Sequence, residues 1–152
     1  MNKEVLVKIA NFCAYQERSH REVKERLAEL ETFGDDADEM TAWLIENNYL
    51  NEERFAKIFA GSKFRQKKWG RLKIKQELKK RGVSDYSLRM GMNEIDPDDY
   101  YETLCELITK KAKEIKDSNP LIQKQKLVNF VLTKGFEQDL VWDAVNEFQK
   151  KQ

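Results

Sequence analysis

Apolar residues recur at the spacing of one helix face along almost the whole chain, and few stretches alternate with the period of a strand. In the first segment, residues 4–16, Val5, Ile9, Phe12 and Cys13 fall on one side of a helix. Further helices are expected to begin near residues 19, 36, 51, 70, 84, 96 and 119, and a last one carries residues 141–148. The pattern therefore predicts an all-α protein.

Three of these segments share a finer pattern. In residues 74–82, and again in residues 127–135, two apolar residues lie four positions apart and a glycine follows four positions after the second. Residues 23–27 match the first part of both, and successive segments are offset by 51 and 53 residues. Gly34 lies seven residues after Leu27 instead of four, which predicts a longer turn in the first repeat.

We therefore expect three tandem three-helix repeats, at residues 1–48, 49–95 and 96–152. A three-helix unit of about fifty residues cannot bury its hydrophobic face fully, so each repeat gains stability by stacking on the next. The expected shape is an elongated, curved helical solenoid. Such a shape exposes more surface per residue than a sphere, which agrees with a charged fraction of 36%.

Composition excludes several classes of protein. No run of 18 apolar residues occurs, and charges interrupt the first segment, so we expect no membrane span, no secretory signal and a cytoplasmic location. Cys13 and Cys105 lack ligand spacing and are expected to be reduced, buried thiols. His20 is the only histidine and is expected on the surface, without partners for catalysis or metal binding. We therefore predict no enzyme, no cofactor and no metal.

The net charge of +1 conceals a strong segregation. Residues 29–53 contain nine acidic and no basic residues. Residues 63–82 contain ten basic residues and one acidic residue, Glu77. The ten are the candidate binding residues: Lys63, Arg65, Lys67, Lys68, Arg71, Lys73, Lys75, Lys79, Lys80 and Arg81.

Such a density of like charge favours a polyanionic partner. The alternative is a solvated helix face, but repulsion between residues four apart makes ten cations in twenty residues unfavourable without a partner. Phe64 and Trp69 interleave with the cations, as residues that stack on bases or pack between helices would.

Four motifs together resemble the RecX family of bacterial recombination regulators. They span nearly the whole chain, in the order and spacing of the family: Arg18-Ser19-x2-Glu22-Val23, Tyr49-Leu50-Asn51-Glu52-Glu53-Arg54-Phe55-Ala56, Gly70-x3-Ile74-x2-Glu77-Leu78-x3-Gly82-Val83 and Lys134-Gly135-Phe136. Asn48 stands where the family usually has glycine before the Tyr-Leu pair, and asparagine tolerates the left-handed conformation of a helix cap.

The resemblance implies a non-enzymatic modulator of the recombinase RecA, built of three three-helix repeats. Such a protein binds the RecA filament on single-stranded DNA and inhibits recombinase, ATPase and coprotease activities. We expect a monomer with weak, non-specific affinity for single-stranded DNA. A direct nucleic-acid-binding module with helix-turn-helix-like units is the alternative, although a dedicated DNA binder usually carries a larger basic excess than +1.

Overall fold

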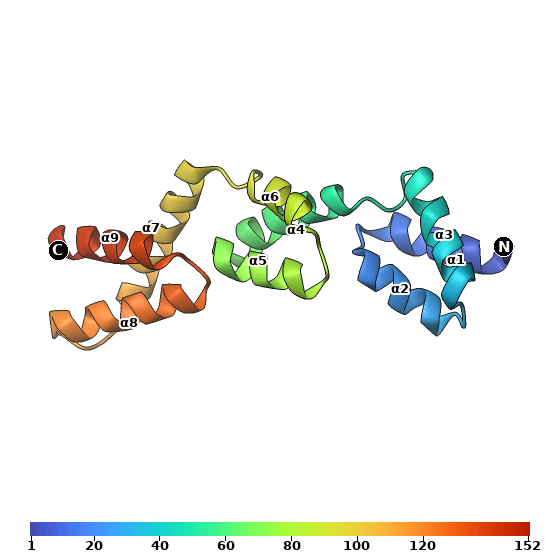
Figure 1. Ribbon diagram of the computed structural model, residues 1–152. Coiled ribbons are helices and arrows are strands. Elements are labelled where there is room, and N and C mark those ends of the chain that lie inside the picture. The colour runs from blue at the N-terminus through green and yellow to red at the C-terminus, as the bar shows by residue number, and fades with distance from the viewer. The chain divides into compact units, whose positions relative to one another are not determined.

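A computed structural model describes residues 1–152 and contains nine α-helices and no β-strand (Figure 1). The all-α prediction is therefore confirmed. The helices are α1 (Lys3–Tyr15), α2 (His20–Glu29), α3 (Gly34–Glu46), α4 (Glu52–Lys67), α5 (Arg71–Lys80), α6 (Asp85–Met92), α7 (Pro97–Glu114), α8 (Pro120–Thr133) and α9 (Gln138–Lys150).

Capping side chains mark the helix starts that the sequence predicted. The Ser19 hydroxyl accepts the Glu22 N–H at 3.1 Å and the Glu22 carboxylate accepts the Ser19 N–H at 3.1 Å, which completes a capping box. Asp96 accepts the Asp99 N–H at 3.0 Å at the start of α7. Proline occupies the first position of both α7 and α8, where its missing N–H costs nothing.

The second helices of the three repeats, α2, α5 and α8, end in the same closure. One residue takes a positive φ, and the N–H of the next residue donates to the carbonyl five residues back. The positive φ angles are 58° at Glu31, 75° at Gly82 and 99° at Gly135. The bonds join Thr32 to Leu27 at 2.8 Å, Val83 to Leu78 at 3.1 Å and Phe136 to Val131 at 3.3 Å. This recurrence confirms the helical repeat fold, whereas the repeat boundaries stay predictions.

The expectation for Gly34 was wrong. Glu31 takes the left-handed position four residues after Leu27, so the first repeat closes in register with the other two. Gly34 instead begins α3, with a φ of 57° and no atom near the place of a side chain. The sequence concealed the match because a non-glycine residue occupies the strained position. Asn48 takes a φ of 63°, as the family comparison of that position predicted.

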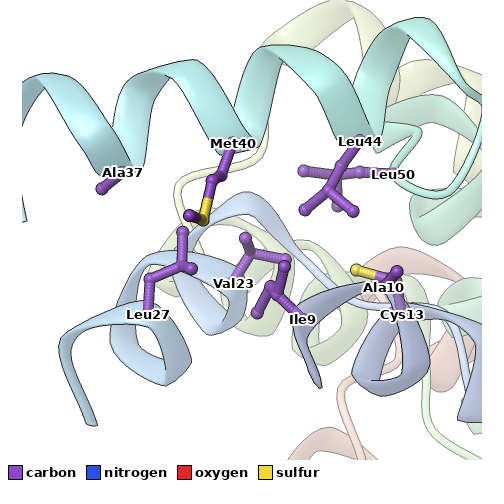
Figure 2. Packing of buried hydrophobic residues seen from close by; sticks show 9 residues of the cluster. All are labelled: Ile9, Ala10, Cys13, Val23, Leu27, Ala37, Met40, Leu44 and Leu50. Carbon is purple, nitrogen blue, oxygen red and sulfur yellow. The ribbon is translucent and has the colours of Figure 1, made fainter. Parts of the chain in front are cut away.

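The helices gather into two compact units, Met1–Phe59 with Glu77–Met92 (unit 1) and Ala60–Gln76 with Asn93–Gln152 (unit 2). In unit 1 the first three helices enclose a core of aliphatic side chains (Figure 2). Ile9, Val23, Leu27 and Leu44 are fully buried there, and each such side chain contributes about 1.5–3 kcal/mol to stability. Leu50, which follows α3, completes this core.

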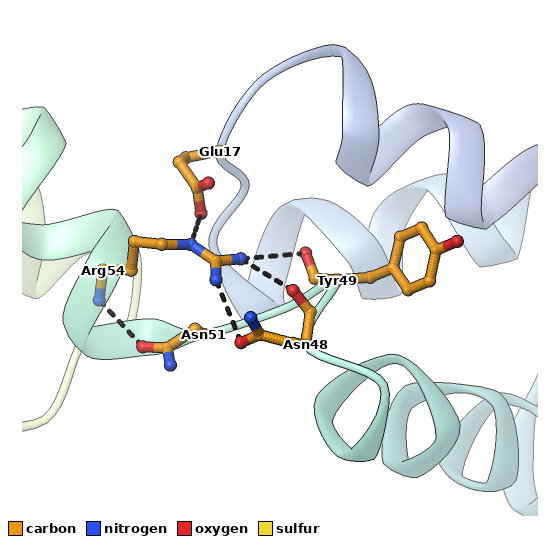
Figure 3. Close-up of polar contacts among 5 residues, drawn as sticks. All are labelled: Glu17, Asn48, Tyr49, Asn51 and Arg54. Atoms are coloured by element: carbon orange, nitrogen blue, oxygen red, sulfur yellow. Dashed lines mark hydrogen bonds and ion pairs between the residues drawn. The ribbon is translucent and has the colours of Figure 1, made fainter.

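Arg54 joins the first and second repeats within unit 1 (Figure 3). Its guanidinium donates to the Glu17 carboxylate at 2.8 Å, to the Asn48 side chain at 3.0 Å and to the Asn48 carbonyl at 3.1 Å. Asn51 caps α4 by accepting the Arg54 N–H at 2.8 Å. These contacts give the polar residues of the second family motif a structural role.

In unit 2 the helices α7, α8 and α9 pack against one another. The fully buried side chains of this core are Tyr100, Leu104, Ile108, Leu127, Val131, Phe136, Val141 and Val145. Phe64 is 6% exposed, and its ring centroid lies 5.8 Å from that of Tyr100. Phe64 is therefore a core residue, so of the two alternatives it packs between helices.

Candidate functional site

The start of α5 rests on the loop between α8 and α9, and this joint positions the candidate site within unit 2. The Gly70 N–H donates to the Lys134 carbonyl at 2.8 Å, and the Leu72 N–H donates to the Gly135 carbonyl at 3.0 Å. Both amides lie at a helix start, where they have no partner inside the helix. A Cβ on Gly70 would lie 2.2 Å from the Gly135 carbonyl carbon, so the backbones meet at a distance that only glycine permits.

Arg71 is used by the joint itself. Its N–H donates to the Tyr100 hydroxyl at 2.8 Å, and its guanidinium pairs with Glu137 at 2.9 Å and lies 3.8 Å from the centre of the Tyr100 ring. The Tyr100 hydroxyl donates in turn to Glu137. Burial and this hydrogen bond raise the pKa of Tyr100 well above its usual range. Arg71 therefore contributes to the packing of this joint.

Beside this joint two lysines lie against the Trp69 ring and two more lie next to them, and we call this group the Trp69 cluster: Lys63, Lys67, Trp69, Lys73 and Lys134. The Lys73 and Lys63 ammonium groups lie 4.6 Å and 5.1 Å from the centre of the Trp69 ring. The Lys134 ammonium donates to the Lys67 carbonyl at 2.9 Å. The cluster thus combines side chains from the end of α4, the start of α5 and the end of α8.

Three of the lysines in the Trp69 cluster have no carboxylate partner. No ion pair joins Lys67, Lys73 or Lys134 to a carboxylate. Burial lowers the pKa of Lys134, and the positive charges of Lys73 and Lys67 lower it further. A fold gains nothing from gathering like charges in a partly desolvated place, so such a group is a candidate site for an anion.

Two of the other predicted cations share one carboxylate partner. Arg81 pairs with Glu77 at 3.0 Å, and Lys80 lies 3.4 Å from the same carboxylate. The Arg81 guanidinium also lies 4.7 Å from the centre of the Phe59 ring, so it packs as part of the fold. Four further cations make no ion pair within the chain: Arg65, Lys68, Lys75 and Lys79. Only three of the ten predicted residues belong to the Trp69 cluster.

Sequence reasoning missed Lys134 as a site residue. It lies more than sixty residues after Lys73 and outside the basic segment, so charge counting along the chain could not find it. The available signal was its place before Gly135, in the motif that closes the second helix of the third repeat. Only the close approach of the Gly70 and Gly135 backbones brings it to the cluster.

No group of three or more His, Cys, Asp or Glu side chains could hold a metal ion. Burial raises the pKa of the Cys13 thiol to about 11, whereas Cys105 is only partly buried, contrary to prediction. His20 is also partly buried. Its Nε2 atom is buried and has no hydrogen-bond partner, so the prediction of a surface histidine was wrong. No helix combines the length and apolar composition that crossing a bilayer requires.

Comparison with known proteins identifies the family. A family model described as the second three-helix domain of RecX matches residues 51–88, and one for the third three-helix domain matches residues 98–145. Together they cover more than half of the chain. The chain belongs to the RecX family. Both matches fall on helices that the repeat pattern groups together, α4 to α6 and α7 to α9.

Relatives named regulatory protein RecX agree with this assignment. The one from Salmonella typhimurium is 30% identical over 154 residues, which cover 95% of this chain and 91% of the relative. The one from Clostridium perfringens is 32% identical over 124 residues, or 80% of this chain and 58% of the relative. The chain thus spans about half the length of several RecX relatives, including that of Bacillus cytotoxicus at 52%.

Solved RecX structures share the fold. The crystal structure of RecX from Lactobacillus salivarius matches with a TM-score of 0.87 at 23% identity, covering 96% of this chain and 95% of that one. A second crystal structure of a regulatory protein RecX has a TM-score of 0.84 at 17% identity, covering 95% of this chain and 70% of that one. These similarities support an all-α helical repeat.

Proposed function

We propose that this chain is a non-enzymatic regulator that binds RecA and its filament on single-stranded DNA and inhibits the recombinase, ATPase and coprotease activities. Membership of a family of regulatory proteins supports this role. The observation that carries it is the Trp69 cluster, in which Lys67, Lys73 and Lys134 lie close together and make no ion pair with a carboxylate. Such a site attracts a polyanion, which a filament offers as acidic protein surface and as DNA phosphates.

The charge balance of the cluster supports a role in binding over a role in stability. Replacing Lys73 with glutamate would place a carboxylate near the Lys134 ammonium, whose pKa burial and the neighbouring lysines lower. This substitution relieves repulsion, so we expect the free energy of unfolding to stay constant or to rise by up to about 1 kcal/mol. The same substitution removes a contact for an anionic partner. A residue that weakens binding and spares the fold when it is replaced is a binding residue.

Direct binding of nucleic acid without RecA is the second candidate function. The arrangement of Lys63 and Lys73 around Trp69 favours it, because cations beside an aromatic ring are typical of single-strand binding sites. The net charge of +1 favours the filament, since a chain this close to neutrality has little long-range attraction for DNA alone. We therefore expect weak affinity for free single strands, which decreases steeply as salt increases.

The test is a titration of the chain into RecA assembled on single-stranded DNA with ATP, followed by the rate of ATP hydrolysis. The parent chain should inhibit hydrolysis. Lys67→Glu/Lys73→Glu should need roughly 30-fold more protein for half inhibition, if two contacts of about 1 kcal/mol each are lost. The matched control is Lys150→Glu/Lys151→Glu, which changes the net charge equally at the end of α9 and should inhibit like the parent.

Two outcomes would contradict the proposal. Undiminished inhibition by the cluster variant would remove the Trp69 cluster from the interface. No effect of the parent chain on hydrolysis or on filament length would remove RecA as the target. Binding of the parent chain to free single strands, measured without RecA, then decides whether the second candidate function replaces the first.

A further inference from the structure

The third repeat contains a second cationic site, outside the basic segment. An open groove of about 670 Å³ lies between the C-terminal end of α7 and one face of α8, entirely within unit 2. Figure 1 shows these two helices and the short connection between them. The side chains that give the groove its chemistry are Lys111, Lys116, Lys126, Asn129, Phe130 and Thr133.

Two of the three groove lysines have no anionic partner. Lys111 pairs with Glu114 at 3.3 Å, and its ammonium lies 4.9 Å from the centre of the Phe130 ring. No carboxylate pairs with Lys116 or Lys126. Glu114, the single acidic residue of the groove, has a side chain that is 60% exposed and is already engaged by Lys111. The groove therefore keeps a net positive charge.

The helix dipole does not explain these charges. Cations in the last turn of a helix are stabilised by the unpaired carbonyls there, which accounts for Lys111 and Lys113 at the end of α7. Lys116 lies beyond α7, and Lys126 lies in the middle of α8. These two lysines remain without a structural reason, and both border the groove.

The α8 face of the groove carries hydrogen-bonding groups beside the charge. Lys126, Asn129 and Thr133 lie three and four residues apart, so they share one side of α8. The Thr133 hydroxyl donates to the Asn129 carbonyl at 2.8 Å, while the Asn129 side-chain amide makes no hydrogen bond within the chain. Lysine, asparagine and threonine are residues that bind phosphate and sugar oxygens of nucleic acids.

Helix α8 connects this groove to the Trp69 cluster. Thr133 borders the groove, and the next residue, Lys134, belongs to the cluster. From Lys126 to Lys134 the helix rises about 12 Å, at 1.5 Å per residue. This length corresponds to three or four nucleotides at about 3.4 Å per nucleotide. One strand can therefore reach both sites along a single helix.

We propose that the groove between α7 and α8 binds the phosphate groups of single-stranded nucleic acid and extends the Trp69 cluster into one track along α8. The proposal deepens the proposed function, since it assigns a nucleic-acid contact to the third repeat of the regulator. The phosphates lie against Lys116 and Lys126, and Asn129 donates to a phosphate or sugar oxygen. Phe130 forms the apolar wall of the groove.

The experiment measures binding of the full chain to a fluorescein-labelled oligothymidylate by anisotropy, without RecA, over a series of salt concentrations. Lys116→Glu/Lys126→Glu should lower the affinity at least tenfold. The slope of log affinity against log salt should fall by about 1.4, at 0.7 per phosphate contact on a single strand. Both lysines are exposed, and far-UV circular dichroism checks that helical content is kept.

Two further variants distinguish binding at this groove from a general effect of net charge. Lys150→Glu/Lys151→Glu makes the same change in charge away from the groove, and its slope should stay within about 0.3 of the parent value. Asn129→Ala/Thr133→Val removes hydrogen-bonding groups and no charge. It should lower the affinity a few-fold and leave the slope unchanged.

Three results would overturn the proposal. Equal losses of oligonucleotide affinity in the groove variant and the charge control would show an effect of net charge alone. Unchanged binding in the groove variant would show that phosphates do not contact Lys116 and Lys126. Loss of RecA inhibition with unchanged oligonucleotide binding would assign the groove to a protein partner. Because the oligonucleotide-binding assays omit RecA, failure of the groove proposal is distinct from failure of the proposed function.

Discussion

Gly70→Ala tests the joint on which the Trp69 cluster depends. The new methyl group would lie 2.2 Å from the Gly135 carbonyl carbon and 2.3 Å from the Phe136 nitrogen, and both are backbone atoms that cannot rotate away. Ordinary contact begins at 3.4 Å, so the backbones must separate by about 1.2 Å.

Such a separation breaks the two hydrogen bonds of the joint, which now measure 2.8 Å and 3.0 Å. Each contributes about 1 kcal/mol, and the strain of forcing extra volume into a packed joint adds about 1–2 kcal/mol. We therefore expect Gly70→Ala to lower the free energy of unfolding by about 3–4 kcal/mol. In urea, followed by far-UV circular dichroism, the midpoint should fall by roughly 1–2 M.

Gly61→Ala is the matched control. Its methyl group would meet the Arg65 guanidinium at 2.8 Å, which is the mobile end of a long side chain. Gly61 lies inside α4, where alanine favours the helix by up to about 1 kcal/mol. The control should therefore be as stable as the parent or more stable. If Gly70→Ala unfolds at the same urea concentration as this control, the close contact of the two backbones does not hold the joint.

Three further predictions concern charge reversal, pH dependence and thiol labelling. A variant with glutamate in place of Lys75, Lys79 and Lys80 of α5 should keep its helical content and inhibit RecA-dependent ATP hydrolysis less than the parent. Inhibition equal to that of the parent would show that these three lysines are not in the interface. Although burial raises the pKa of Glu52, hydrogen bonds from Ser84 and Ser87 hold it below its ordinary value of 4.5. The stability that the Glu52 carboxylate adds is therefore complete above pH 4.5 and disappears as pH falls through the lower pKa of the folded state. Glu52→Gln should lower the free energy of unfolding at neutral pH and leave it unchanged in strong acid. Urea titrations of parent and variant at both pH values measure this difference. A thiol reagent should label the partly buried Cys105 in the native chain and reach Cys13 only after unfolding, and equal labelling rates would contradict the burial of Cys13.

The helices and their caps were predictable because they depend on residues close in sequence. Ser19 and Glu22 form the capping box that their spacing indicated, and Asp96 caps α7. The closure at Glu31 was not predictable, because a left-handed glutamate carries no sequence signal. The misassigned Gly34 shows the limit of glycine as a marker, since it begins a helix instead of ending one.

The positive charge of the candidate site was predictable, but the residues that form it were not. The basic segment indicated an anionic partner, yet tertiary contacts decide which cations can meet one. Glu77, the one acidic residue of the basic segment, engages Arg81, and Glu137, far outside that segment, engages Arg71. Lys134 joins the site from α8 through a backbone contact between two glycines. Pairings of this kind depend on the packing of repeats, which periodicity along one helix does not encode.

The most direct test of the account asks which part of the chain touches the filament. A photoreactive benzoylphenylalanine replaces either Lys67, at the exposed edge of the Trp69 cluster, or Lys150, near the end of α9. Each variant is irradiated with RecA assembled on single-stranded DNA. The account predicts covalent adducts with RecA or DNA from position 67 and none from position 150. Adducts from position 150 alone, in a chain that still inhibits ATP hydrolysis, would contradict it.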